Sequence, residues 1–236
     1  MILVCDGVVS AGDLELAEPE MLLNDAASVA TYGMQDRYDS SGNGYDLVTD
    51  NDFTLLGMST VADGTHGAST GIIETDEMTF AVCINMDLPA VSGRIFSNLY
   101  PGVAPFGGIQ LRIQDDGQLI LQLATGNITA EGTVSTVTVA HGGAVGGWTR
   151  FTATVSNTEI AITRASGEKR STAVTARKKS PLPIMLNGGV SPEQNMGLPG
   201  MMGIIAVYNR VLSADEQTEK RSMLKEIMAL RGVVVN

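Results

Sequence analysis

A glycine-rich turn in the first third of the chain carries the oxygen-bearing side chains best suited to hold a cation. Asp39, Asn43 and Asp46 lie within Asp-Ser-Ser-Gly-Asn-Gly-Tyr-Asp. Glycines let backbone carbonyls approach a shared point, and Ca²⁺ takes roughly six to eight such oxygen ligands. An EF-hand loop that started at Asp36 would end at Leu47, where such a loop requires a glutamate, so an EF-hand is excluded. The segment predicts a calcium site or, alternatively, an Asx-rich turn that only reverses the chain.

A second candidate site is the loop between Tyr100 and Phe106, where two prolines and one glycine lie between two aromatic residues. Sugar recognition usually combines an aromatic surface with convergent polar groups, so these two residues are candidate ligand contacts. Loop aromatics also serve to pin a loop to its own domain. Aromatics are only 5% of the chain, and we expect Trp148 to fill the core.

Catalytic constellations are not found in the sequence. His66 and His141 are far apart and belong to no His-Glu-x-x-His motif. The segment around Ser59 lacks the closing glycine of a nucleophile elbow. The glycine-rich residues 142–147 precede a predicted strand rather than a helix, so no helix dipole favours phosphate there. We therefore assign no catalytic residue and expect a protein that is not an enzyme.

The net charge of −11 is unevenly distributed. Residues 1–78 carry 15 acidic side chains and one basic one, whereas the rest carries 11 acidic and 14 basic side chains. An acidic surface excludes nucleic acid as a partner of the N-terminal third. It suits a cation, a basic neighbour or simple solvation. A cluster of basic residues is expected on hairpin turns: Lys169, Arg170, Arg177, Lys178 and Lys179. It could bind anionic glycans or the acidic leader of another copy. Alternatively, it protects a sheet edge against aggregation.

From residue 79 onward the sequence predicts one short strand after another. In residues 109–113, Ile and Leu alternate with Gln and Arg, which is the period of a half-buried strand. Turn residues such as Asp115-Asp116-Gly117 separate the runs. Such spacing without helices predicts an antiparallel sandwich or barrel. The predicted strands are 79–86, 94–99, 108–114, 118–124, 134–139, 148–155, 159–164, 182–186 and 201–208.

One helix is predicted, over residues 214–231, after the capping box formed by Ser213 and Glu216. Its apolar stripe must pack, because an isolated helix of this length is marginal in water. The stripe covers either its own sandwich or a neighbouring subunit. The apolar ends, residues 1–5 and 233–235, are β-prone and could pair with each other or with a neighbour. The residues predicted for assembly contacts are Met223, Leu224, Ile227, Met228, Val233 and Val235.

Two cysteines, Cys5 and Cys83, are too few for a disulfide framework, and we expect both to be small buried apolar residues. No uncharged apolar run approaches the roughly 20 residues of a membrane span. The first residues, which meet Asp6 at once, do not read as a signal peptide.

Three stretches in order carry a resemblance to a known family. They are Val-Ala-Thr-Tyr32 with the 39–47 turn, Gly-Gly-Trp148-Thr-Arg-Phe-Thr-Ala-Thr-Val, and Gly203-Ile-Ile-Ala-Val-Tyr-Asn-Arg-Val-Leu-Ser-Ala-Asp-Glu. Together they resemble the concanavalin A-like lectin/glucanase superfamily in its laminin-G-like or pentraxin-like form. The resemblance implies an all-β antiparallel jelly-roll sandwich, here with one C-terminal α-helix. The expected parts are an acidic leader (1–26), the sandwich (27–212), and the helix with a short tail (213–236).

The resemblance implies a fold and not an activity. Its glucanases carry Glu-x-Asp-x-x-Glu on one strand, whereas Glu74-Thr-Asp76-Glu77 lacks the final glutamate. Relatives act mostly outside cells, and bacteriophage proteins can do so without an export signal. We therefore expect a non-catalytic virion surface protein, a homo-oligomer that binds host-surface glycans or a receptor, without nucleic acid or membrane insertion. The alternatives are a purely structural phage protein and a secreted carbohydrate-binding module.

Overall fold

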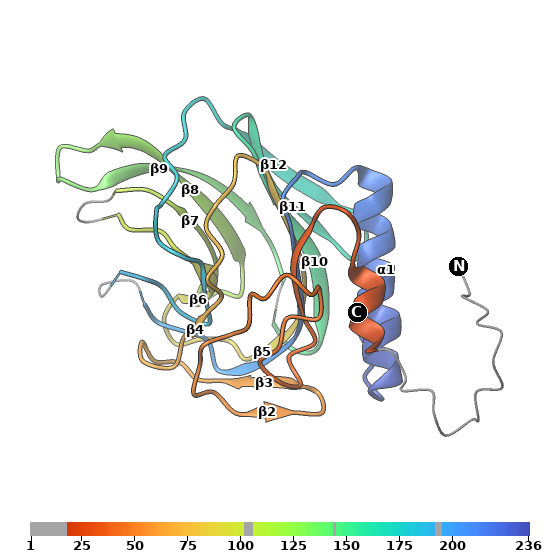
Figure 1. Ribbon diagram of the computed structural model, residues 1–236. Helices are drawn as coiled ribbons and strands as arrows, with labels where there is room; N and C mark the ends of the chain where they lie inside the picture. The colour runs from red at the N-terminus through yellow and green to blue at the C-terminus, as the bar shows by residue number, and fades with distance from the viewer. Residues whose placement is uncertain (1–17, 102–105, 144, 192–194) are drawn as a thin grey trace, which may run out of the picture.

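Two antiparallel sheets pack face to face in the computed structural model, and one long helix lies outside them (Figure 1). The structure describes residues 18–101, 106–143, 145–191 and 195–236. Within these residues, the eight-stranded sheet has the order β12-β11-β10-β5-β14-β3-β2, with β1 also paired to β14. The six-stranded sheet has the order β4-β13-β6-β7-β8-β9. These findings confirm the predicted antiparallel sandwich with a C-terminal helix.

The strands of the eight-stranded sheet are β1 Ser28–Tyr32, β2 Phe53–Thr54, β3 Gly57–Thr60, β5 Met78–Met86, β10 Thr149–Val155, β11 Glu159–Arg164, β12 Lys169–Ala173 and β14 Gly200–Tyr208. Those of the six-stranded sheet are β4 Ala68–Ser69, β6 Gly93–Ser97, β7 Ile109–Ile113, β8 Leu119–Ile128, β9 Val134–His141 and β13 Met185–Leu186. The two helical elements are the 3-10 turn η1 Pro19–Leu23 and the helix α1 Ala214–Leu230.

Two predicted segments need correction. The strand expected over 182–186 is reduced to β13, because Pro181 and Pro183 have no amide hydrogen to give to a neighbouring strand. Lys169 and Arg170, expected on a turn, lie in β12, which pairs with β11 at the edge of its sheet. This strand is polar on both faces, so its sequence shows no alternation of apolar and polar residues from which a strand could be predicted.

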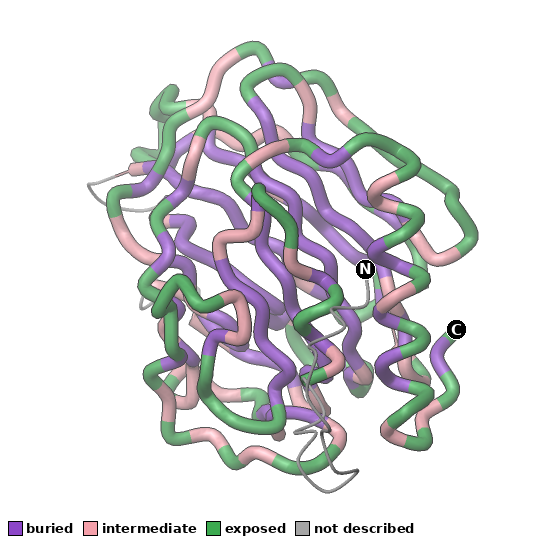
Figure 2. The backbone as a smooth tube through the Cα atoms, turned by 45° about the vertical axis from the view of Figure 1, so that its right-hand side comes forward, coloured by how far each residue is buried: buried purple, intermediate pink, exposed green. Residues whose placement is uncertain are grey.

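The main core fills the space between the sheets, where Figure 2 shows mostly buried strands. Phe80 of β5 and Phe96 of β6 stack with their ring centroids 4.2 Å apart, so one aromatic pair joins the two sheets. Ile109, Leu111 and Ile113 belong to this core. The inward side of β7 is therefore the one that its alternation predicts.

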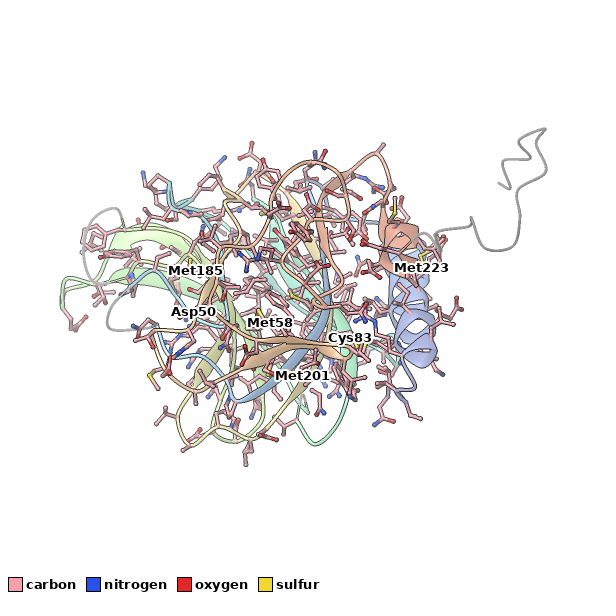
Figure 3. The ribbon with its side chains drawn as sticks, turned by 60° about the horizontal axis from the view of Figure 1, so that its bottom comes forward. Asp50, Met58, Cys83, Met185, Met201 and Met223 are labelled. Atoms are coloured by element: carbon pink, nitrogen blue, oxygen red, sulfur yellow. The ribbon has the colours of Figure 1, made fainter. Side chains whose placement is uncertain are left out.

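Helix α1 covers the outer face of the eight-stranded sheet and forms a second apolar cluster with it. The predicted capping box is present, with both Ser213 and Glu216 hydrogen bonds formed. Cys83 is buried in this cluster, as predicted, and burial raises the pKa of its thiol to about 12. Figure 3 labels Cys83 on the sheet and Met223 on the helix.

The helix stripe that was expected to cover either the sandwich or a neighbour covers the sandwich. Leu224, Ile227, Met228 and Val235 are already buried by the chain itself. They are consequently unavailable as contacts to a second copy, and this corrects their assignment as assembly residues. Met223 and Val233 are only partly buried, so they remain candidates for that role.

The last residues of the predicted leader pack onto the helix. The Tyr208 hydroxyl and the Lys220 ammonium both donate to the Leu23 carbonyl, at 2.8 Å each. Arg231 lies 3.4 Å from the buried carboxylate of Glu20. Residues 1–17, and with them Cys5 and the predicted pairing of the N-terminal end, lie outside the described residues. Within those residues, η1 is part of the folded domain.

Within the described residues, the C-terminal end is held by hydrogen bonds to residues 148 and 150. The Asn236 amide donates to the Trp148 carbonyl at 3.1 Å, and Arg150 donates to the Val235 carbonyl at 3.1 Å. Trp148, predicted to fill the core, is only partly buried and packs against the second cluster rather than between the two sheets. No helix in the described part of the chain is long and apolar enough to cross a membrane.

Candidate functional site

A hollow of about 290 Å³ opens on the outer face of the six-stranded sheet. Polar side chains from four neighbouring strands contribute to it, and Leu99, Pro101, Thr133 and Val134 complete the lining that the structure describes. The polar residues are Arg94 of β6, Gln110 and Arg112 of β7, Gln122 of β8 and Thr136 of β9. We call this feature the sheet hollow.

A row of hydrogen-bonded side chains crosses the sheet hollow. Arg94 Nε donates to Gln110 Oε1 at 3.3 Å, and Gln110 Nε2 donates to Gln122 Oε1. Gln122 Nε2 in turn donates to the hydroxyls of Thr138 at 3.2 Å and Thr136 at 3.5 Å. The register explains the row, since Gln110 pairs with Gln122, which pairs with Thr138. Side chains at paired positions share one face of a sheet.

Two arginines lie opposite each other beside this row. Arg94 and Arg112 are paired across β6 and β7. Arg112 Nη1 donates to Ser92 Oγ at 2.8 Å, and Arg94 Nη1 donates to the Ser92 carbonyl at 3.1 Å. Burial, and secondly the charge of Arg112, lower the pKa of Arg94 to about 10. Burial also lowers the pKa of Arg112. Both guanidinium groups are thus held in a partly desolvated site.

The predicted ligand contacts Tyr100 and Phe106 lie beside the sheet hollow but do not line it. The Tyr100 amide donates to the Gly107 carbonyl at 2.8 Å, which closes the loop. Phe106 packs against a small cluster of Leu99, Ala124 and Val134. Since Leu99 and Val134 line the hollow, the aromatic residue supports its wall. Residues 102–105 lie outside the described residues.

The predicted calcium turn is braced by its own hydrogen bonds. Asp39 Oδ1 accepts from the amides of Thr31 and Ser41 at 2.9 Å each, and Oδ2 accepts from the Ser41 hydroxyl at 2.9 Å and the Tyr45 amide at 3.2 Å. Asp46 Oδ1 accepts from the Asp39 amide at 3.0 Å. Asn43 Nδ2 donates to the carbonyls of residues 28 and 29 at 3.0 Å. These bonds fit the Asx-turn alternative.

The acidic side chains of the described residues do not by themselves form a group that could bind a metal ion. Within the residues that the structure describes, no group of three or more His, Cys, Asp or Glu could hold a metal ion. A calcium site at the turn would therefore depend on carbonyl oxygens besides Asp39 and Asp46. Calcium binding here stays a prediction.

The acidic string 74–77 forms a structural clamp. Arg177 Nη2 lies 2.9 Å from Glu74 Oε2, and the Ser180 amide donates to Glu74 Oε1 at 2.8 Å. Lys179 pairs with Asp76 at 2.6 Å. The basic cluster is thus divided between this clamp and the edge strand β12, where Lys169 pairs with Glu159 and Arg170 with Glu168.

The sheet hollow was not among the predicted sites, although part of it has a signal in the sequence. Gln110 and Arg112 alternate with the core residues of β7, which places them on the outer face. A single sequence does not say which strands lie beside β7. The contributions of Arg94, Gln122 and Thr136 follow only from the strand order.

Comparison with solved structures gives neighbours with a similar fold. The botulinum neurotoxin serotype D ligand binding domain in complex with N-acetylneuraminic acid has a TM-score of 0.61 at 10% identity, covering 86% of this chain and 52% of that one. Domain 4 of AbnA, an arabinanase from Geobacillus stearothermophilus solved with arabinotriose, has 0.60 at 17% identity, covering 84% and 100%. The sialidase CBM40 of Ruminococcus gnavus, bound to sialyllactose, has 0.50 at 16% identity, covering 61% and 82%.

These identities establish likeness of fold, and this chain spans about half the length of the neurotoxin domain. No curated protein matches the sequence. A family model described as the Concanavalin A-like lectin/glucanases superfamily matches residues 58–216, which is more than half of the chain. The match confirms the resemblance on which the fold prediction rests. The chain therefore belongs to the concanavalin A-like lectin/glucanase superfamily.

Proposed function

We propose that this domain binds carbohydrate in the sheet hollow and does not cleave it. The observation that carries the proposal is the row of hydrogen-bonded side chains from Arg94 through Gln110 and Gln122 to Thr138. Sugar hydroxyls act as both donors and acceptors. Glutamine amides and threonine hydroxyls offer both roles as well, so this row matches the chemistry of a sugar ring.

The row also has the stiffness that a binding site needs. Gln110 is buried, and its side chain is held from both sides by Arg94 and Gln122. Gln122 and Thr136 are half-buried and Thr138 is exposed, so one end of the row is open to a ligand. Rotamers that are fixed before binding lose little entropy when the ligand arrives.

The structural neighbours support carbohydrate as the ligand class. The three described above were solved with N-acetylneuraminic acid, arabinotriose and sialyllactose. Their shared fold makes a sugar a reasonable first ligand to test, while the site in this chain rests on its own residues.

Binding without cleavage agrees with the state of the 74–77 carboxylates. Glycoside hydrolysis requires two carboxyl groups that flank the sugar bond. Both oxygens of Glu74 are engaged by Arg177 and Ser180, and the side chain is buried. Incubation with polysaccharides should accordingly release no reducing ends.

A glycan array followed by calorimetry tests this proposal. Gln122→Ala should weaken binding of the best glycan, because it removes the central link of the row. Gln118→Ala is the matched control, since Gln118 is an exposed residue of the β7–β8 hairpin outside the lining. If a folded wild type binds no glycan, or if both variants bind as it does, the proposal fails.

A second candidate function, a structural subunit of an assembly, is supported by apolar residues beside helix α1. Met21, Leu22 and Leu230 are exposed, and Leu22 and Leu230 line one apolar depression together with Met223. Light scattering of the wild type and of Leu230→Lys tests this candidate. A wild type that is monomeric at high concentration would contradict it.

The expected location on a bacteriophage surface, as a tail-fibre, tail-tip or head-decoration component, stays a proposal that rests on the sequence argument above. Antibody labelling of particles in electron micrographs would test it. Labelling of particle surfaces is the expected result, and unlabelled particles in a lysate that contains the protein would contradict it.

A further inference from the structure

The strongest unexplained feature of the sheet hollow is its positive charge. Arg94 and Arg112 occupy directly paired positions on β6 and β7. Arg112 lies on the outer face of β7, and its side chain lines the hollow. A guanidinium in this position offers its positive charge to a ligand.

The side chain of Arg112 is anchored but incompletely paired. Its Nη1 donates to Ser92 Oγ at 2.8 Å. Its Nε is buried without a hydrogen-bond partner, and its Nη2 makes no hydrogen bond to the described part of the chain. No carboxylate of the described residues forms an ion pair with it. Nη2 is not among the buried atoms without partners, so it is the donor of Arg112 that a ligand oxygen in the hollow would accept from.

The charge of the hollow also contrasts with that of the whole molecule. The chain carries a net charge of −11, whereas the described lining of the hollow has two arginines and no acidic residue. Arg112 therefore attracts a negatively charged ligand at this point, and the net negative charge of the remainder tends to repel it.

We propose that the sheet hollow selects acidic sugars, whose carboxylate is bound by the guanidinium group of Arg112 with Arg94 beside it. This inference rests on the proposed function and names its ligand class. A planar guanidinium matches a planar carboxylate through two parallel hydrogen bonds. The glutamine and threonine side chains of the row then bind the hydroxyls of the same sugar or of its neighbour.

The test uses pairs of oligosaccharides that differ only at C6, glucose against glucuronate and galactose against galacturonate, together with sialylated and sulfated glycans. The wild type should bind the carboxylated member of each pair about tenfold more tightly. Its methyl ester should bind like the neutral member, because the ester has the same shape without the charge. Increasing salt should weaken only the binding of the acid.

Two variants of the full chain assign the effect to Arg112. Arg112→Gln should abolish the preference for the acid, so that the acid and the neutral sugar bind with equal affinity. Arg112→Lys keeps the charge but loses the two-pronged geometry, so it should retain part of the preference. Arg170→Gln is the control, since Arg170 is an exposed arginine on the edge of the other sheet. Circular dichroism and melting confirm that each variant is folded.

The outcomes separate this inference from the proposed function. Equal binding of acid and neutral sugar, or a stronger preference for sulfated glycans, would overturn the acidic-sugar inference and leave glycan binding intact. An equal loss of acid and neutral binding in Arg112→Gln would also overturn it, because Arg112 would then only shape the site. Absence of binding to any glycan would overturn the proposed function itself.

Discussion

Arg177 and Glu74 form an ion pair of 2.9 Å in which both side chains are almost completely buried, at 3% and 0% exposed. Arg177 also donates to the carbonyls of Thr75 and Asp76. The pair therefore ties residues 74–76, just before β5, to residues 177–180, about a hundred positions later. Acidic residues that could have suggested catalysis hold two loops together instead.

Replacing Glu74 by Gln should destabilise the protein strongly. The guanidinium of Arg177 would remain buried without its counter-charge, and breaking a buried pair in this way costs about 3–5 kcal/mol. Urea unfolding measures the loss. Asp76→Asn is the matched control, because the Asp76–Lys179 pair is exposed and should change the free energy of unfolding little. Equal effects of the two variants would contradict the clamp.

The aromatic stack between the sheets should be a major contributor to stability. Phe96→Ala removes the ring that contacts Phe80 across the core, and such truncations cost about 3–5 kcal/mol. Leu55→Ala, at a residue that is 79% exposed, should change little. A loss below about 1 kcal/mol for Phe96→Ala would show that the two sheets do not depend on this pair.

The capping box of helix α1 gives a pH-dependent contribution. Hydrogen bonds from Arg210, and then from Ser213, hold the pKa of Glu216 at about 2, below its ordinary 4.5. A lowered pKa means that the stabilisation is complete above about 4.5 and is lost as the pH falls through about 2. Glu216→Gln should therefore lower the melting temperature at neutral pH, and the difference from wild type should vanish near pH 2.

Melting curves at several pH values measure this difference. Glu226→Gln, at an exposed position later in the helix, serves as the control for a general change of helix charge. A difference between Glu216→Gln and wild type that stayed constant from neutral pH to pH 2 would contradict the role of the carboxylate.

The turn at residues 39–46 allows its structural role to be separated from calcium binding. Asp39→Ala leaves several amides of the turn without their acceptor, so it should lower the melting temperature even in EDTA. The calcium prediction adds a second effect: millimolar Ca²⁺ should raise the melting temperature of the wild type, and Asp46→Ala should abolish that rise. A wild type that melts identically in Ca²⁺ and EDTA would contradict calcium binding.

The fold could be predicted largely because apolar and polar residues alternate along its strands. In β7 and β10 the apolar residues recur at every second position, and turn residues separate the strands. Strand β12 was not predicted, because all its residues are polar, small or charged. The helix was predicted from Ser213, Glu216 and its apolar stripe, but the sequence left open whether that stripe covers its own sheet.

The candidate site could be predicted only in part, since it depends on which strands become neighbours. Gln110 and Gln122 come from strands joined by a hairpin, so their pairing could have been anticipated. Arg94 reaches the same face because β6 pairs with β7 through an irregular register, with a shift between Arg94 and Phe96. Such a shift moves side chains from one face to the other, and no local sequence signal specified it.

The most direct test of carbohydrate binding in the sheet hollow is a titration of ¹⁵N-labelled protein with the best glycan from the array, followed by NMR. If the sugar binds in the hollow, the largest shifts fall on Gln110, Gln122, Thr136 and Thr138, including the side-chain amides of the two glutamines, and helix α1 is unaffected. Shifts centred on residues 39–46 or on α1, with the six-stranded sheet unchanged, would contradict it.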